Sequence, residues 1–164
     1  MLTLSEVKKI VYDKCHILGV DIDSDPYFAF ELTRIVEFGG AYIDIEGSKY
    51  SYIVMERGKV IRRYDSENLD DILFYLFNSI TQTLVTKYCA SYRRENPKID
   101  TRIIWYPKQL ELLEKVNSSF VEMRHEKMRE VLEESPLRHE NGQPMSKEEM
   151  EEALGFALFT SHNA

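Results

Sequence analysis

Cysteine is scarce in this sequence of 164 residues, which contains only Cys15 and Cys89. Two cysteines are too few for the disulfide framework of a small secreted domain. Each lies in an apolar stretch typical of a helix, so we expect both to be small buried side chains. Glycine and proline are also few, at 7 and 5 residues. This excludes collagen-like and low-complexity chains.

Long apolar runs are missing as well. No stretch approaches the roughly 18 consecutive apolar residues of a membrane-spanning helix. The segment Met1–Glu6 has neither the basic nor the apolar region of a secretory signal. We therefore expect a cytoplasmic protein that does not bind membranes.

Positive charge is in deficit, because 28 acidic residues stand against 21 basic ones and give a net charge of −7. Nucleic-acid binding needs clustered Lys and Arg, so we expect no nucleic-acid partner. The acidity suits a basic protein partner, since opposite potentials steer association. It also suits plain solubility, and both explanations stay open.

Motifs of catalysis and metal binding are absent. Alternating carboxylates at Asp21, Asp23 and Asp25 resemble the start of a calcium loop, but Pro26 stands where that loop needs glycine and Leu32 where it needs glutamate. No glycine-rich phosphate loop and no nucleophile elbow occurs. We therefore predict no metal site, no cofactor and no catalytic residues, which favours a binding protein over an enzyme.

The N-terminal half predicts a helix followed by strands. Thr3 and Glu6 have the spacing of a capping box, and apolar residues then recur at helical spacing over residues 4–18. Residues 20–40 fit neither period. The next part favours a three-stranded antiparallel meander. Its strands and turns are predicted at Ala41–Glu46, Gly47-Ser48, Tyr50–Arg57, Gly58-Lys59 and Val60–Tyr64. The central strand is apolar on both faces, so both faces should be covered, at least in part.

The C-terminal half predicts helices. The apolar stripe starting at Leu69 indicates a long helix to about Arg94, capped by Ser66 or Asn68. Further helices are predicted at about 107–117, with a start as early as Asp100 left open, and at about 119–134 and 146–158. The fold class is α+β: an N-terminal helix, an antiparallel meander of three or four strands, then a long helix and further C-terminal helices packed on the sheet. We expect one domain over residues 1–136, and a linker and terminal helix over 137–164 docked on that domain or on a partner chain.

The charge map suggests where a partner binds. Residues 21–46 have a balance of −6, residues 47–64 of +4, and residues 65–71 of −4. The first predicted strand presents one aromatic and two acidic side chains on one face, which makes a plausible surface for a basic protein, although a simple solvated face fits as well. The candidate binding residues are Tyr42, Asp44, Glu46, Asp65, Glu67, Asp70 and Asp71.

Glu56 and Arg57 form a second polar cluster, at the end of the central strand. A carboxylate that holds an arginine there can orient a binding surface. An ion pair that merely closes a hairpin is the other interpretation.

Several short segments, in this order, resemble the immunity protein 63 family of bacterial polymorphic toxin systems. They are Tyr50–Lys59 with Arg62-Arg63, Asn68–Phe77, Ser79–Tyr88 with Arg93, Arg94 and Asn96, Asp100 with Arg102, and Gln109–Leu113. The resemblance covers residues 40–135. It departs at Leu76, where relatives tend to have Trp, and residues 137–164 extend beyond the usual end of the family.

This resemblance implies a bacterial protein that binds and neutralises a cognate toxin domain without catalysis. The toxin would be encoded by a neighbouring gene and would be basic, in keeping with the acidity of this chain. The alternative is a small-molecule-binding protein or an enzyme whose site lies near Glu56 and Arg57.

Overall fold

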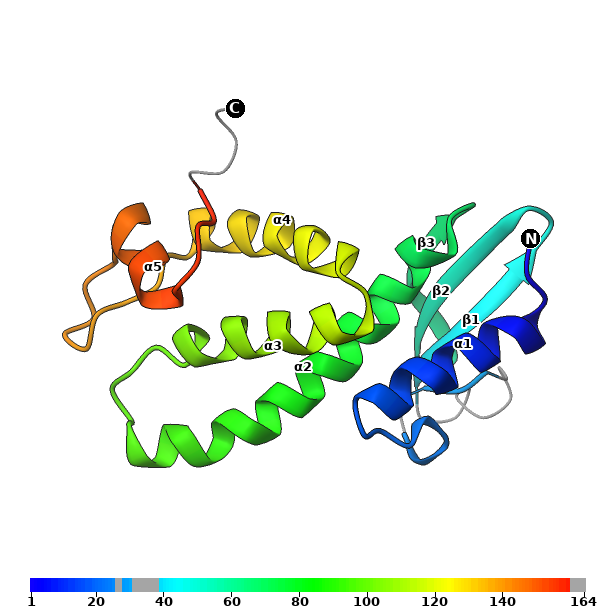
Figure 1. Ribbon diagram of the computed structural model, residues 1–164, viewed down its shortest axis with the longest axis horizontal. Coiled ribbons are helices and arrows are strands. Elements are labelled where there is room, and N and C mark those ends of the chain that lie inside the picture. The colour runs from blue at the N-terminus through cyan, green and yellow to red at the C-terminus, as the bar shows by residue number, and fades with distance from the viewer. Residues whose placement is uncertain (26–27, 31–38, 160–164) are drawn as a thin grey trace. The chain divides into compact units, whose positions relative to one another are not determined.

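The computed structural model of the chain describes residues 1–25, 28–30 and 39–159 (Figure 1). It divides into two compact units, unit 1 (Met1–Phe77) and unit 2 (Asn78–Ala164), which are described separately below. The division falls within a long helix, α2 (Leu69–Glu95), so each unit contains part of that helix. The predicted α+β class is confirmed, with an N-terminal helix, a three-stranded antiparallel sheet and helices after it.

Unit 1 begins with helix α1 (Leu4–Ile17), within one residue of its predicted end. The predicted capping box is present: the Thr3 hydroxyl accepts a hydrogen bond from the Glu6 backbone N–H, and the Glu6 carboxylate accepts one from the Thr3 N–H. Val7, Val11 and Cys15 form the buried stripe at a spacing of four. Burial raises the pKa of the Cys15 thiol to about 11, which agrees with an inert core residue.

The sheet consists of β1 (Gly40–Glu46), β2 (Lys49–Glu56) and β3 (Lys59–Ser66), in the order β1-β2-β3. The second turn was predicted one residue too late, since it is made by Arg57 and Gly58. Both residues have positive φ, 49° and 75°, as a type I′ turn requires to match the twist of its strands. In the stretch 20–40, whose pattern fits neither period, the structure has a short 3-10 helix, η1 (Ile22–Ser24), and a parallel bridge between Phe28 and Ala41 beside β1. Residues 26–27 and 31–38 lie outside the described part.

The two faces of the sheet differ because successive side chains of a strand point to opposite sides. One face is covered by helices. There the Leu2 N–H donates a hydrogen bond of 2.7 Å to the Tyr50 hydroxyl, and the ring of Tyr75 on α2 stacks on those of Tyr52 and Tyr64. Figure 1 shows α1 running alongside this sheet. We call the face with Tyr50, Tyr52 and Tyr64 the helix-covered face.

Unit 2 contains the rest of α2, α3 (Arg102–Val116), α4 (Ser119–Glu134) and α5 (Lys147–Leu154). The predicted capping box of Ser146 and Glu149 starts α5, but the helix ends at Leu154 and not at residue 158. Gly155 stops it with a φ of 77°, a conformation that glycine adopts freely. The apolar core of this unit joins three helices and the chain between them. Its buried residues are Tyr106, Leu110, Met128, Leu132, Leu137, Met150, Leu154 and Leu158.

A buried amide connects three helices of unit 2. The Gln109 side chain is fully buried, and its NH₂ group donates to the Asn78 side chain at 3.1 Å and to the Thr81 hydroxyl at 3.2 Å. Its oxygen accepts a hydrogen bond of 2.8 Å from Nε of Arg124 on α4. The Arg124 guanidinium also lies over the rings of Trp105 and Tyr106. This network satisfies polar groups that would be costly to bury alone.

Candidate partner-binding surface

The sheet face opposite the helix-covered one, which we call the polar face, carries most of the predicted binding residues. Strand register sets Tyr42 of β1 beside Ile53 of β2 and Arg63 of β3, and Asp44 beside Ser51 and Asp65. Because residues two apart share a face, these side chains gather on one side of the sheet. The polar face comprises Tyr42, Asp44, Glu46, Ser51, Ile53, Met55, Arg63 and Asp65, of which Ser51 and Ile53 are buried and Glu46, Arg63 and Asp65 are exposed.

Arg63 organises this face. Its Nε donates to Oδ1 of Asp65 at 2.8 Å and its Nη2 to Oγ of Ser51 at 3.1 Å. The Ser51 hydroxyl in turn donates to Oδ1 of Asp65 at 2.6 Å. Nη2 of Arg63 also lies 3.8 Å from a carboxylate oxygen of Glu46, so one guanidinium joins acids from β1 and β3. Asp65 is thereby held in place, and Glu46 lies near the same guanidinium group.

Arg63 and Asp65 each stabilise the charged form of the other. The hydrogen bonds that Asp65 accepts from Ser51 and Arg63 lower the pKa of its carboxyl group. The hydrogen bond and the charge of Asp65 raise the pKa of Arg63, and the charges of Glu46 and Asp44 act in the same direction. The face therefore keeps both signs of charge at neutral pH, with the carboxylates in the majority.

The second predicted acidic segment lies elsewhere in unit 1, in the turn from β3 into α2. Asp71 accepts hydrogen bonds from the Ser66 hydroxyl at 2.7 Å and from the Asn68 side chain at 3.3 Å. Oδ1 of Asn68 caps α2 by accepting from the Asp70 N–H at 3.1 Å. Asp71 thus serves the helix start, whereas Glu67 and Asp70 are exposed. The structure brings together Tyr42, Asp44, Glu46 and Asp65, and leaves Glu67, Asp70 and Asp71 in this turn.

The model of the family described as immunity protein 63 matches residues 46–130, which span the β1–β2 turn, strands β2 and β3, helices α2 and α3 and most of α4. The chain belongs to the immunity protein 63 family. The match includes Ser51, Arg63 and Asp65 of the polar face. Comparison with curated proteins and with solved structures gives no match.

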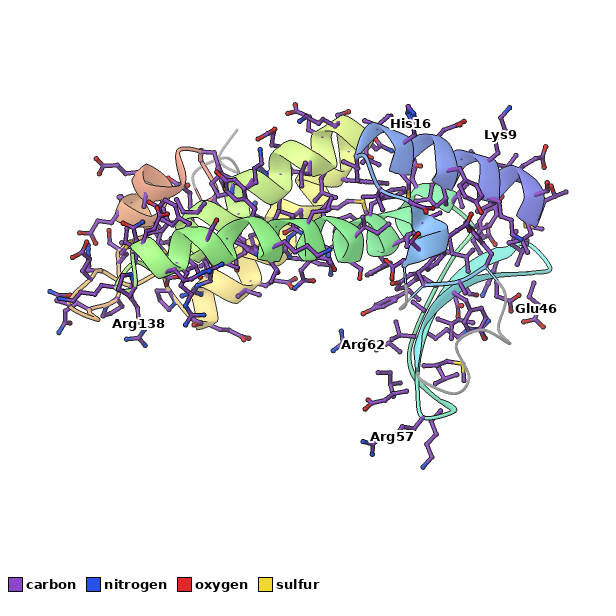
Figure 2. The ribbon with its side chains drawn as sticks, turned by 90° about the horizontal axis from the view of Figure 1, so that it is seen from below. Lys9, His16, Glu46, Arg57, Arg62 and Arg138 are labelled. Carbon is purple, nitrogen blue, oxygen red and sulfur yellow. The ribbon has the colours of Figure 1, made fainter. Side chains whose placement is uncertain are left out.

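Glu56 and Arg57, which resemble the family motif, lie at the tip of the β2–β3 hairpin and are both exposed. Figure 2 shows Arg57 at this end of the sheet and Glu46 at the other. Within the described residues, Glu56 makes no ion pair shorter than 4.0 Å. An exposed turn of this kind gives no enclosure for a small molecule, so the geometry does not support the alternative of a ligand or catalytic site there.

Asp100 and Arg102 form an ion pair in unit 2. Both residues belong to the segments that resemble the family, but local spacing does not predict what they contact. The Asp100 carboxylate accepts from Nε and Nη2 of Arg102 at 3.0 and 2.8 Å, and from the backbone N–H of Arg138 at 3.2 Å. Arg102 also donates to the backbone carbonyls of Ser135 and Pro136. The pair therefore ties the start of α3 to the segment after α4. It borders a hollow of about 250 Å³ whose lining includes Tyr92, Ile103 and Met145.

In the described part of the chain, no three His, Cys, Asp or Glu side chains lie close enough together to hold a metal ion. The acidic turn that resembles a calcium loop serves local structure. Asp21 accepts from the backbone N–H of Asp23 and from the Ser24 hydroxyl, while Asp23 accepts from the Tyr12 hydroxyl. In those same described residues, no helix has the length and apolar character to cross a bilayer.

Proposed function

We propose that this protein is an immunity protein that binds and neutralises a cognate toxin domain of a bacterial polymorphic toxin system, without catalysis. Membership of the immunity protein 63 family supports a toxin partner in general terms. The observation that carries the site is the polar face, where Arg63 holds Asp65 and approaches Glu46. The toxin would be blocked by occupation of its surface.

Preorganisation is the physical reason for choosing this face. A charged side chain that is already fixed loses little conformational entropy when a partner binds. Asp65 is fixed by two hydrogen bonds, and Oδ1 of Asp44 accepts one from the Ile45 N–H at 2.9 Å. Tyr42 adds a half-buried ring of the kind that often anchors interfaces. A basic toxin would be steered to this face by its carboxylates.

The function is tested by co-expression with the product of the adjacent gene, with host growth and co-purification as readouts. We expect the adjacent product alone to arrest growth and this chain to restore it as a stable complex. A toxic neighbour that this chain neither binds nor neutralises would refute the proposal.

The site is tested by removing its carboxylate charges together with its aromatic ring. The variant that combines Tyr42→Ala, Asp44→Asn, Glu46→Gln and Asp65→Asn should raise the Kd of the complex by about a hundredfold or more. The association rate of the wild type should fall with salt, and this dependence should weaken in the variant. The matched control is Glu126→Gln, Glu130→Gln and Glu152→Gln, which neutralises exposed acids of unit 2. Equal affinity of the site variant and the wild type would show that the polar face is not the interface.

A further inference from the structure

The tip of the β2–β3 hairpin exposes two large apolar side chains to solvent. Val60 and Ile61 are exposed by 55% and 53%, although both are β-branched residues of a sheet. Arg57, Lys59 and Arg62 surround them in the chain and are themselves exposed. Figure 2 shows Arg57 and Arg62 projecting from this hairpin, away from α1. We call Arg57, Lys59, Val60, Ile61 and Arg62 the cationic tip.

An irregularity in the pairing shapes this tip. Val54 of β2 pairs with Arg62, whereas the next residue, Met55, pairs with Val60. Ile61 is therefore an extra residue in β3, and it forms a β-bulge. Without the bulge, Val60 and Arg62 would share a face. With it, Val60 joins Met55 on the side of the polar face and Arg62 lies on the other side.

The turn itself is strained at a residue that is not glycine. Arg57 has a φ of 49°, and it is the only non-glycine with positive φ in the part of the chain that the structure describes. A type I′ turn favours Asn or Gly at this position, because other side chains crowd the left-handed conformation. Because arginine at this position destabilises the turn, we infer that the Arg57 side chain has a functional role.

The basic side chains of the tip form no ion pairs among the described residues. Residues 57–62 carry three bases and no acid. No ion pair within 4.0 Å involves Arg57, Lys59 or Arg62 among the described residues, whereas the neighbouring Arg63 is engaged by Asp65. Two exposed aliphatic side chains whose neighbours in the chain are basic have the composition of an interface anchor flanked by charge.

We propose that the cationic tip is a second docking element, which inserts Val60 and Ile61 into an acidic, apolar-centred depression of the toxin domain. This inference rests on the proposed function, and it divides the contact into two parts of opposite charge on one sheet. The polar face would meet basic groups of the toxin, and the tip would meet acidic ones. A partner that lacked this second charge pattern would be rejected.

The composition of the tip favours a protein over other occupants. A second copy of the chain pairing edge to edge along β3 would set arginines against arginines, since Arg62 and Arg63 lie in the middle of the strand. A nucleic acid would be attracted by the bases but has no use for two aliphatic side chains, and the chain as a whole carries −7.

The test measures binding of the toxin domain encoded by the adjacent gene to three variants. Arg57→Glu with Arg62→Glu should raise the Kd about a hundredfold, and Val60→Thr with Ile61→Thr about tenfold, with strand propensity kept. Arg57→Asn should weaken binding yet raise the Tm by about 1–3 °C, because asparagine relieves the turn. The controls are Lys9→Glu with Lys98→Glu, and Ile17→Thr, all at exposed positions outside the tip.

The outcomes separate this inference from the proposed function. If the wild type and all tip variants bind the toxin equally, the tip proposal is overturned and the immunity function stands. If the wild type does not bind the toxin, both fall. Binding of a labelled RNA or DNA oligonucleotide at physiological salt that Arg57→Glu with Arg62→Glu abolishes, or a dimer in solution that it dissociates, would also overturn the assignment to a toxin surface.

Discussion

The rings of Tyr64 on β3 and Tyr75 on α2 stack with their centroids 3.7 Å apart and their planes 13° apart. Tyr52 of β2 stacks against the same ring of Tyr75 at 6.3 Å. The three rings come from three elements of unit 1 and hold the start of α2 against the helix-covered face. Stacked aromatic pairs stabilise by about 0.5–1.5 kcal/mol beyond their burial.

Truncation of this stack should destabilise the protein. We expect Tyr64→Ala to lower the free energy of unfolding by about 1–3 kcal/mol, through lost stacking and lost burial of a half-exposed ring. Tyr64→Phe keeps the ring and should cost less than about 1 kcal/mol. Urea unfolding followed by circular dichroism measures both. A Phe variant as unstable as the Ala variant would assign the effect to the hydroxyl instead.

The buried Gln109 should tolerate no apolar replacement. Gln109→Leu has a similar volume but removes the acceptor for Arg124 and the donors to Asn78 and Thr81. Several polar groups would then lack partners, and we expect a loss of about 2–4 kcal/mol of unfolding free energy. Urea unfolding tests this, with Gln82→Leu on the exposed side of α2 as the control. A loss no larger than that of the control would show that water replaces the network.

The Asp100–Arg102 pair should make unit 2 sensitive to acid. Burial raises the pKa of Asp100, but the hydrogen bonds from Arg102 and the N–H of Arg138 outweigh it and hold the pKa below 3.8. A lowered carboxyl pKa stabilises the fold above the unfolded-state pKa and is lost as the pH falls through the folded-state value. We expect Asp100→Asn to cost about 1–3 kcal/mol at pH 7 and proportionately less near pH 2.

The measurement for Asp100 is unfolding by urea at pH 7 and pH 2. Arg102→Lys retains the positive charge but loses the paired N–H groups, so it should reproduce part of the loss. A penalty for Asp100→Asn that stays the same at both pH values would contradict the ion-pair account.

His125 should couple the stability of unit 2 to pH in a second range. Its ring stacks on Phe156 at 5.1 Å, and its Nε2 is buried without a hydrogen-bond partner among the described residues. Burial lowers its pKa below 6.5, Glu122 opposes this, and Arg129 adds to it. A histidine whose folded pKa is depressed destabilises the fold as the pH falls from 6.5 to the folded value, because the unfolded chain binds the proton first.

We expect the Tm of the wild type to drop between pH 7.5 and pH 5.5 by more than that of His125→Phe. The Phe variant keeps the stacking on Phe156 and has no titrating nitrogen. The control is His16→Asn, at an exposed position of α1. If the wild type and His125→Phe lose the same Tm over this interval, other groups cause the loss.

Elements with a strong local signal were predictable. The capping boxes at Thr3 and Ser146 and the apolar stripes of α1, α2 and α4 depend on residues three or four apart, so the sequence contains their full description. The errors lie where two local signals compete. Arg57 enters a left-handed turn that its side chain disfavours, and Gly155 ends α5 although Ala157 and Leu158 continue the apolar pattern.

The alternation of the strands, the caps of the helices and the order of segments typical of the immunity protein 63 family can be read directly from the amino-acid sequence. Which acids of different strands lie together follows only from the folded sheet. Register across three strands brings Asp44, Ser51 and Asp65 together, and Arg63 then reaches Glu46, 17 positions earlier in the chain. Local spacing cannot encode such pairs, because each depends on how two turns and one bulge set the strands against each other.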